Sequence, residues 1–413
     1  MIVNLDQLTN AMSKVKSFAQ DTKMIPGILL NFKDNAIDVC YCDGRKAIIE
    51  KVDADMQAGE QLGPVIVPYQ LFVEVVNACQ PSGLLVCDDL EISVLENNRF
   101  NVKTVKYAIV AKPNGEDDYE EFKKPVSKFE QEIKYYRVDE DRRFGLLTRI
   151  DYDSIFSGEL YDVWDRSSLQ DVLKKLSKED SKTCYCSSKE KAAFVVNVDH
   201  SIYIPKDELD EVGFSIVSKW AKYVVEILNK VSSDKVHVSV EGGTHCRIYT
   251  PDNKVGIWFE MAPGTAMDKM TIETYRQKDY GHYQVVFNRY ALMDAVKKAL
   301  AIDNLDSTSF TFKDSENGLV VSIVSGKGAS KARDFSVIAE AYKDNAGDLI
   351  QTSIPVSLKA LSVVVDNCDG AYLIMDVAVD NSGKCIRYTD VIGREDDGTP
   401  IAGALYYTLS VRK

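Results

Sequence analysis

The chain has 413 residues, 45% of them hydrophobic, and a formal net charge of −13. This length suggests two to four domains with a sizeable core. The acidic charge argues against a simple nucleic-acid-binding protein, unless the positive charge is gathered on one surface.

The opening residues, MIVNLDQLTNAMSKVK, are amphipathic and lack the apolar stretch of a signal peptide. No apolar run approaches the roughly 18 residues that suggest a membrane span. The nine cysteines show no disulfide framework. We therefore expect a cytoplasmic protein with reduced cysteines and no contact with a membrane.

Six segments carry apolar residues at helical spacing. In chain order they predict helices over 6–20, 68–80, 167–178, 216–231, 290–301 and 355–368. Alternating apolar and polar residues around turn signals predict hairpins over 28–43, 192–204 and 309–325. A short strand is expected before each helix. The chain is therefore interpreted as six strand–helix–strands units, grouped in three pairs.

This pattern predicts an α+β protein with domains near 1–125, 159–280 and 281–413. Residues 112–158 are polar and charged, and we interpret them as a linker followed by an insertion at 126–158. The repetition could also arise by chance in a generic α+β chain. The paired spacing of all six helices argues against that alternative.

The organisation resembles the beta-type sliding clamp of bacterial DNA polymerase III and its phage relatives, in order and over most of the chain. The segments that carry the resemblance are MIPGILLNF (24–32), DDYEEFKKP (117–125), VNVDHSIYI (196–204), YQVVFNRYALMDAVKKAL (283–300) and TLSVRK (408–413). The stretch 126–158 and the acidic loop GREDDGTP (393–400) depart from the family pattern.

The resemblance implies a three-domain clamp fold, with helices inside and sheets outside a ring that two chains close head to tail. It implies a processivity factor that encircles duplex DNA, tethers a DNA polymerase and is placed on DNA by a clamp loader. The dimer contacts that it implies are Tyr107 and Ile109 of the first domain against Leu300 and Ile302 of the third.

Duplex DNA carries about one negative charge per 1.7 Å of axis, so helices that line the hole should be positive. Lysines outnumber acidic residues on four of the six expected helices. Contacts to phosphates would carry no sequence preference. The lysines expected to face DNA are Lys14, Lys16, Lys23, Lys174, Lys175, Lys178, Lys219, Lys222, Lys297, Lys298 and Lys359. The alternative is that they form ordinary solvated helix surfaces.

In the family, polymerases and clamp loaders insert a short apolar peptide between the second and third domains, beside the C-terminus. An apolar wall with a few polar groups suits such recognition. By position, the resemblance implies a pocket made by Asp199, His200, Ile202, Tyr275, Arg276, Leu409 and Val411, with Tyr275 and Arg276 on a loop. Alternatively, Leu409 and Val411 are core residues of a last strand.

No catalytic triad spacing, phosphate-binding glycine loop or dinucleotide motif is present. The C-x-C pairs Cys40/Cys42 and Cys184/Cys186 could offer thiolates to a metal, but a closed zinc site needs four ligands. We favour buried strand cysteines, and expect no enzyme activity, cofactor or metal. Two other functions remain open: a non-ring scaffold or virion protein built from the same repeats, and a hydrolase that uses scattered carboxylates.

Overall fold

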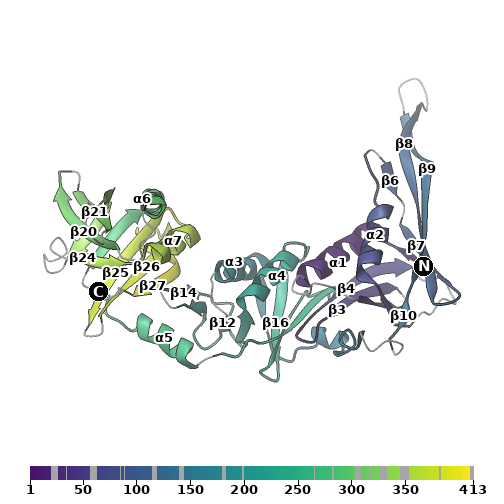
Figure 1. The fold of residues 1–413 in the computed structure, drawn as a ribbon, viewed down its shortest axis with the longest axis horizontal. Helices are drawn as coiled ribbons and strands as arrows, with labels where there is room; N and C mark the ends of the chain where they lie inside the picture. The colour runs from purple at the N-terminus through teal and green to yellow at the C-terminus, as the bar shows by residue number, and fades with distance from the viewer. Residues whose placement is uncertain are drawn as a thin grey trace. The chain divides into compact units, whose positions relative to one another are not determined.

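The computed structural model (Figure 1) describes part of the chain, to which every structural statement below refers. The described residues are 1–19, 27–33, 35–55, 63–83, 85–87, 89–113, 119–138, 144–178, 183–197, 200–264, 266–280, 283–302, 308–316, 318–325, 333–344, 353–380 and 383–409.

The predicted sixfold repetition is confirmed by the order of the elements, because a strand, a helix and three strands recur six times. The first repeat is β1 (Ile2–Val3), α1 (Leu5–Phe18), β2 (Ile28–Lys33), β3 (Ala36–Cys42) and β4 (Lys46–Asp55). The second is β5 (Val65–Val67), α2 (Tyr69–Cys79), β6 (Leu85–Cys87), β7 (Leu90–Leu95) and β8 (Arg99–Pro113).

The middle of the chain follows the same order. The third repeat is β11 (Tyr161–Asp165), α3 (Arg166–Ser177), β12 (Thr183–Ser187), β13 (Ala192–Val196) and β14 (His200–Pro205). The fourth is β15 (Phe214–Val217), α4 (Ser218–Leu228), β16 (Lys235–Glu241), β17 (His245–Tyr249) and β18 (Val255–Glu260).

The last two repeats complete the series. The fifth is β19 (Tyr283–Asn288), α6 (Arg289–Ile302), β20 (Thr308–Ser315), β21 (Gly318–Ser325) and β22 (Arg333–Ile338), followed by an additional strand, β23 (Ala341–Asp344). The sixth is β24 (Ser353–Val356), α7 (Leu358–Asn367), β25 (Tyr372–Asp380), β26 (Gly383–Arg394) and β27 (Pro400–Leu409). The helices match the six predicted segments to within a few residues at each end.

Consecutive repeats exchange their leading strands. β1 pairs with β7 of the second repeat, and β5 pairs with β2 of the first. In the same way β11 pairs with β16 and β15 with β12, while β19 pairs with β25 and β24 with β20. Each pair of repeats is therefore interlocked through backbone hydrogen bonds, which is why the repeats group in twos.

The chain divides into two compact units, Met1–Leu173 with Lys222–Met261, and Lys174–Ala221 with Ala262–Lys413. In the first unit β4 pairs with β18 and continues the 14-stranded sheet into the fourth repeat. In the second unit β14 pairs with β27 inside a 9-stranded sheet, beside a 4-stranded sheet. Each unit thus contains a joint between two repeats that are distant in sequence.

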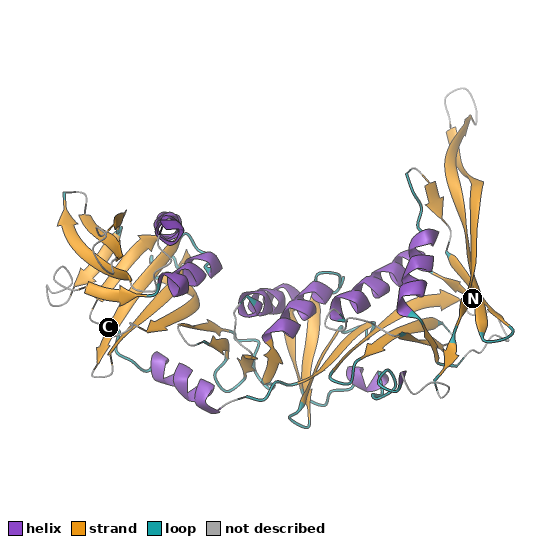
Figure 2. Ribbon diagram, in the orientation of Figure 1, coloured by secondary structure: helices purple, strands orange, loops and turns teal. Residues whose placement is uncertain are grey.

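Amphipathic helices cover one face of the sheets, as α1 and α2 do in the first unit (Figure 2). Helix α1 begins at an Asn4 cap, whose side chain accepts the Gln7 N–H at 2.9 Å. Its apolar stripe, including Leu8 and Val15, is fully buried against strands of the first repeat. No described helix has the length and apolar content needed to cross a bilayer.

The region interpreted from sequence as a linker and insertion contains regular structure. Residues Tyr119–Lys134 form strand β9, which pairs with β8 along the whole length of β8. β10 (Tyr136–Arg137) then pairs with β5, and a 3-10 turn, η2, follows at Asp153–Phe156. Strand β9 escaped the sequence analysis because almost all of its described side chains are exposed, which leaves no apolar alternation to detect.

A tight turn after α7 depends on a glycine. The fully buried Asp390 accepts the N–H groups of Asp369 and Gly370, each at 2.9 Å. A Cβ atom on Gly370 would lie 1.8 Å from the Val391 carbonyl oxygen. We expect Gly370→Ala to lower the free energy of unfolding by about 3 kcal/mol, because backbone must move to relieve the clash.

Urea denaturation measures this loss. Gly63→Ala is the matched control, because a Cβ there meets no atom within 4 Å, and it should leave the unfolding midpoint nearly unchanged. Equal stability of the Gly370→Ala variant and the parent would show that the turn does not need glycine.

Candidate functional site

The helices present most of the expected lysines to solvent. The exposed members of the expected set are Lys16, Lys174, Lys178, Lys219, Lys222, Lys297, Lys298 and Lys359. They lie on α1, α4, α6 and α7, and on or directly after α3. Helix α2 carries no lysine, and its one charged residue is Glu74. Lys23 lies outside the described residues.

Lys14 is a correction to the expected set. Its side chain is 2% exposed and its Nζ lies 2.7 Å from Oε1 of Glu50 on β4. A DNA phosphate cannot reach an ammonium group enclosed in this way. Lys14 is therefore part of the core of the first unit, and the sequence interpretation of Lys14 as a DNA contact is wrong.

Three further lysines are already paired with carboxylates. Lys175 pairs with Asp369. Lys297 lies 3.4 Å from Asp366, and Lys298 lies 2.6 Å from Asp294. Such partners offset part of the positive charge that these helices could present. Lys178 donates a hydrogen bond to the Asn367 side chain at 3.0 Å. The remaining exposed lysines of the expected set are Lys16, Lys174, Lys219, Lys222 and Lys359.

The residues of the expected partner pocket fall on two faces of one sheet. Alternate residues of a strand point to opposite faces, so His200 and Ile202 of β14 face one side and Tyr203 faces the other. The ring of Tyr275 stacks on Tyr407 at 5.8 Å, and the Arg276 guanidinium lies 4.4 Å from the ring of Tyr203. Tyr275 and Arg276 therefore cover the face opposite to Ile202.

A helix that the sequence analysis missed carries those two residues. Helix α5 (Ala266–Arg276) lies where a loop was expected. It packs through the fully buried Ile272 onto an aromatic cluster that includes Tyr185, Phe194 and Tyr280. The Tyr185 hydroxyl donates to Asp268 of α5 at 2.6 Å. These contacts fix α5 on the sheet that joins the third and sixth repeats.

The remaining pocket residues lie near the end of the last strand. His200 is directly opposite Thr408 in the β14–β27 ladder, so His200 is adjacent to the end of β27. Its Nε2 atom is 3.1 Å from the Asn197 amide nitrogen. Leu409 is the last residue of β27, whereas Asp199 and Val411 lie outside the described residues.

The expected dimer contacts lie on one strand and one helix. Tyr107 and Ile109 belong to β8, and Ile109 is 50% exposed. Leu300, which is partly buried, and Ile302 belong to the last turn of α6. Both edges of β8 near Tyr107 are occupied, because Tyr107 is opposite Val86 of β6 on one side and Pro125 of β9 on the other.

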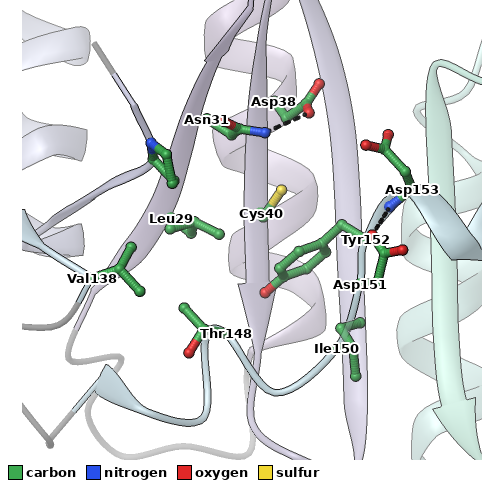
Figure 3. A pocket seen from close by; sticks show the side chains of 11 residues that line it. Leu29, Asn31, Asp38, Cys40, Val138, Thr148, Ile150, Asp151, Tyr152 and Asp153 are labelled. Atoms are coloured by element: carbon green, nitrogen blue, oxygen red, sulfur yellow. Dashed lines mark hydrogen bonds between the residues drawn. The ribbon is translucent and has the colours of Figure 1, made fainter.

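A pocket of about 300 Å³ in the first unit lies over β2 and β3 (Figure 3). Its lining residues are Leu29, Asn31, Asp38, Cys40, Pro64, Val138, Thr148, Ile150, Asp151, Tyr152 and Asp153. Burial raises the pKa of the Cys40 thiol well above its ordinary value, and Asp38 is held by Lys33 at 2.7 Å. The pocket therefore presents no activated nucleophile.

The paired cysteines are enclosed in the sheets. Cys40, Cys42, Cys184 and Cys186 are buried, and burial raises the pKa of Cys42 to about 11. Protonated thiols are poor metal ligands. Within the described ranges, no three His, Cys, Asp or Glu residues form a group that could hold a metal ion.

Comparison with solved structures identifies the fold. The DNA polymerase III beta subunit of Thermotoga maritima superposes with a TM-score of 0.67 at 16% identity, covering 100% of this chain and 99% of that one. The sliding clamp of Bacillus subtilis gives 0.69 at 13% identity, covering 100% and 98%. The beta chain of Streptococcus pneumoniae gives 0.70 at 12%, covering 100% of both chains.

No protein-family model and no curated protein matches the sequence. The chain nevertheless has the fold of the DNA polymerase III beta subunits over its full length. The predicted α+β clamp fold, built from paired strand–helix–strands units, is confirmed.

Proposed function

We propose that this chain is a DNA sliding clamp, a non-enzymatic processivity factor that encircles duplex DNA and tethers a DNA polymerase. The observation that carries the proposal is the full-length likeness to beta subunits, in which all six repeats are retained. The exposed lysines of the helices support it, since the chain as a whole carries a net charge of −13.

The proposed ring is a cytoplasmic head-to-tail homodimer, with helices toward the hole and sheets outside. Its domains fall near 1–125, 159–280 and 281–413, and the pairing of β9 with β8 extends the first of them to about residue 134. A heterologous interface closes into a ring when the rotation between copies permits. A clamp loader is the further partner that a closed ring requires.

The proposed mechanism is topological. A closed ring leaves DNA slowly because it must open or reach an end, and it does not need tight contacts. Lysine suits this role, because its ammonium group is a hydrated point charge on a flexible stem. A partner peptide is proposed to bind near His200 and the end of β27, which are adjacent in the sheet.

The DNA-facing surface is tested by replacing Lys16, Lys174, Lys219, Lys222 and Lys359 together with alanine. Each lysine that meets a phosphate contributes about 1 to the slope of log affinity against log salt. We expect the slope for a short duplex to fall, by less than the number of lysines removed, since the five lysines do not all contact phosphate simultaneously. The loss should be equal on AT-rich and GC-rich DNA.

A control variant replaces Lys103, Lys189, Lys191, Lys235 and Lys254, which lie outside the helices and whose side chains are each at least 44% exposed. It removes the same charge from the chain and should leave the slope nearly unchanged. An unchanged slope in the helix variant, or equal losses in both variants, would contradict a DNA-facing helix surface.

A further inference from the structure

The two joints inside the chain follow one rule. In the first unit the last strand of the first repeat, β4, pairs antiparallel with the last strand of the fourth, β18. In the second unit the last strand of the third repeat, β14, pairs antiparallel with the last strand of the sixth, β27. Each joint therefore links an odd repeat to the even repeat three places further on.

A hydrogen bond between helix ends accompanies each joint. Lys230, just after α4, donates to the Ser17 hydroxyl in the last turn of α1 at 2.7 Å. Lys178, just after α3, donates to the side chain of Asn367 at the end of α7 at 3.0 Å. The joints thus share both their strand pairing and their helix contact.

The rule leaves the second and fifth repeats without a partner. The chain ends after the sixth repeat, so the third place beyond the fifth repeat falls on the second repeat of a following copy. By the same rule, β22, the last strand of the fifth repeat, should meet β8, the last strand of the second repeat, in that copy. Within the described strands, β22 pairs only with β21 and therefore lies at the edge of its sheet. The matching edge of β8 is already filled along its length by β9.

Among the described strands, β9 therefore forms the edge of this sheet, and its two halves differ. The half before residue 127 contains Lys123, Lys124 and Pro125, and a bulge leaves Val126 without an opposite residue on β8. Lysine, proline and bulges all discourage the addition of another strand. The half from Ser127 to Lys134 pairs regularly with Arg99–Lys106. It contains no proline and no bulge, and its two lysines are Lys128 and Lys134.

This second half also has the side-chain pattern that a joint needs. Ile133 is fully buried on the face that α2 covers, whereas Glu130 and Glu132 are exposed. β22 has the same pattern, with Val337 5% exposed on the face that α6 contacts and Ile338 51% exposed. A sheet that continued from β9 into β22 would keep one helix-covered apolar face throughout.

We propose that a second copy of this chain adds its strand β22 to β9 over residues 127–134. The joint between copies then contains one more strand than the two joints within the chain. It also moves the contact away from Tyr107 and Ile109, whose strand has no free edge at this position. The inference rests on the proposed ring, for which it names the closing surface.

Cysteine cross-linking tests the proposal on the full chain. Lys128, Glu130 and Glu132 are replaced by cysteine one at a time, each together with Ile338→Cys or Ser336→Cys. A disulfide needs Cβ atoms about 4 Å apart, so only neighbouring strands can form it. We expect at least one combination to give about tenfold more cross-linked dimer than Lys123→Cys with the same partners. The parent chain is the background control, because eight of its nine cysteines are buried.

Sedimentation of the reduced proteins is measured in parallel. A dimer of twice 46.2 kDa with cross-links confined to the 127–134 half supports the inference. A dimer that cross-links no better there than at Lys123 overturns it and leaves the ring intact. A chain that stays monomeric also overturns it, and retention on end-blocked DNA then decides separately whether the clamp function stands.

Discussion

On a linear duplex with both ends blocked, the protein is expected to stay bound far longer than on the same duplex with free ends. A ring held by topology escapes an open duplex by sliding to an end, whereas on a blocked duplex it must first open its interface. The residence time on the blocked duplex is then set by how fast the interface between the two chains opens. The two duplexes should therefore differ in the rate at which the protein dissociates from them. Surface plasmon resonance or single-molecule fluorescence measures both residence times.

The chains should associate in the presence of the duplex, so that rings close around it. Adding a nuclease site between the blocks gives the matched control, because cutting should release the protein at once. Raising the salt should shorten the stay only slightly on blocked DNA, since contacts to phosphates are not what retains the ring. Equal residence times on open and blocked duplexes would contradict the sliding-clamp proposal and favour a non-ring scaffold.

Replacing Lys14 with alanine is expected to lower the free energy of unfolding by about 3–5 kcal/mol. The substitution leaves Glu50, which is 7% exposed, as a buried carboxylate without its cation. The pair itself need not stabilise the fold, because removing two charges from water is costly. Lys14→Met combined with Glu50→Leu should therefore recover most of the loss. Urea denaturation followed by circular dichroism gives the free energy of unfolding of the parent, the Lys14→Ala variant and the double variant.

The Lys14 variant should also depend on pH in a defined direction. Burial raises the pKa of Glu50 above its ordinary value, and Lys14 opposes that rise. Without Lys14 the pKa in the folded state rises further, so the folded state binds a proton more readily than the unfolded chain. Stability then falls as the pH rises from the unfolded pKa toward the folded one, and the variant should be less impaired near about pH 5 than near about pH 7.

Lys16→Ala is the control on the same helix. Lys16 is exposed, so its loss should leave stability nearly unchanged. A loss under about 1 kcal/mol in the Lys14 variant would mean that water reaches Glu50, because exposed ion pairs contribute little.

The helices could be predicted because each buries a continuous apolar stripe, such as Leu8, Met12, Val15 and Phe18 in α1. The stripe is a local property of the sequence, and so is the alternation that located the hairpins. Helix α5 escaped detection because its contact with the sheet rests largely on Ile272 and two flanking tyrosines, Tyr275 and Tyr280. That pattern is too sparse to stand out from a loop.

The site was harder to predict because its residues depend on tertiary partners. Nothing near Lys14 in sequence indicates that Glu50, on strand β4, lies against its ammonium group. The acid partners of Lys175 and Lys297 lie in the sixth repeat, far along the chain. Likewise, the separation of Ile202 from Tyr275 by a sheet follows from where α5 packs, which spacing along the chain does not reveal.

The exchange of leading strands between repeats has a consequence for synthesis on the ribosome. Ile2 pairs with Asp55 within the first repeat, but its second ladder partner is Glu91 of the second repeat. Synthesis as far as Glu91 takes on the order of ten seconds at typical translation rates. During that interval the first repeat has an incomplete sheet whose open edge can recruit other nascent chains. A pause or truncation between the two repeats of a pair should therefore yield aggregates rather than a folded single repeat.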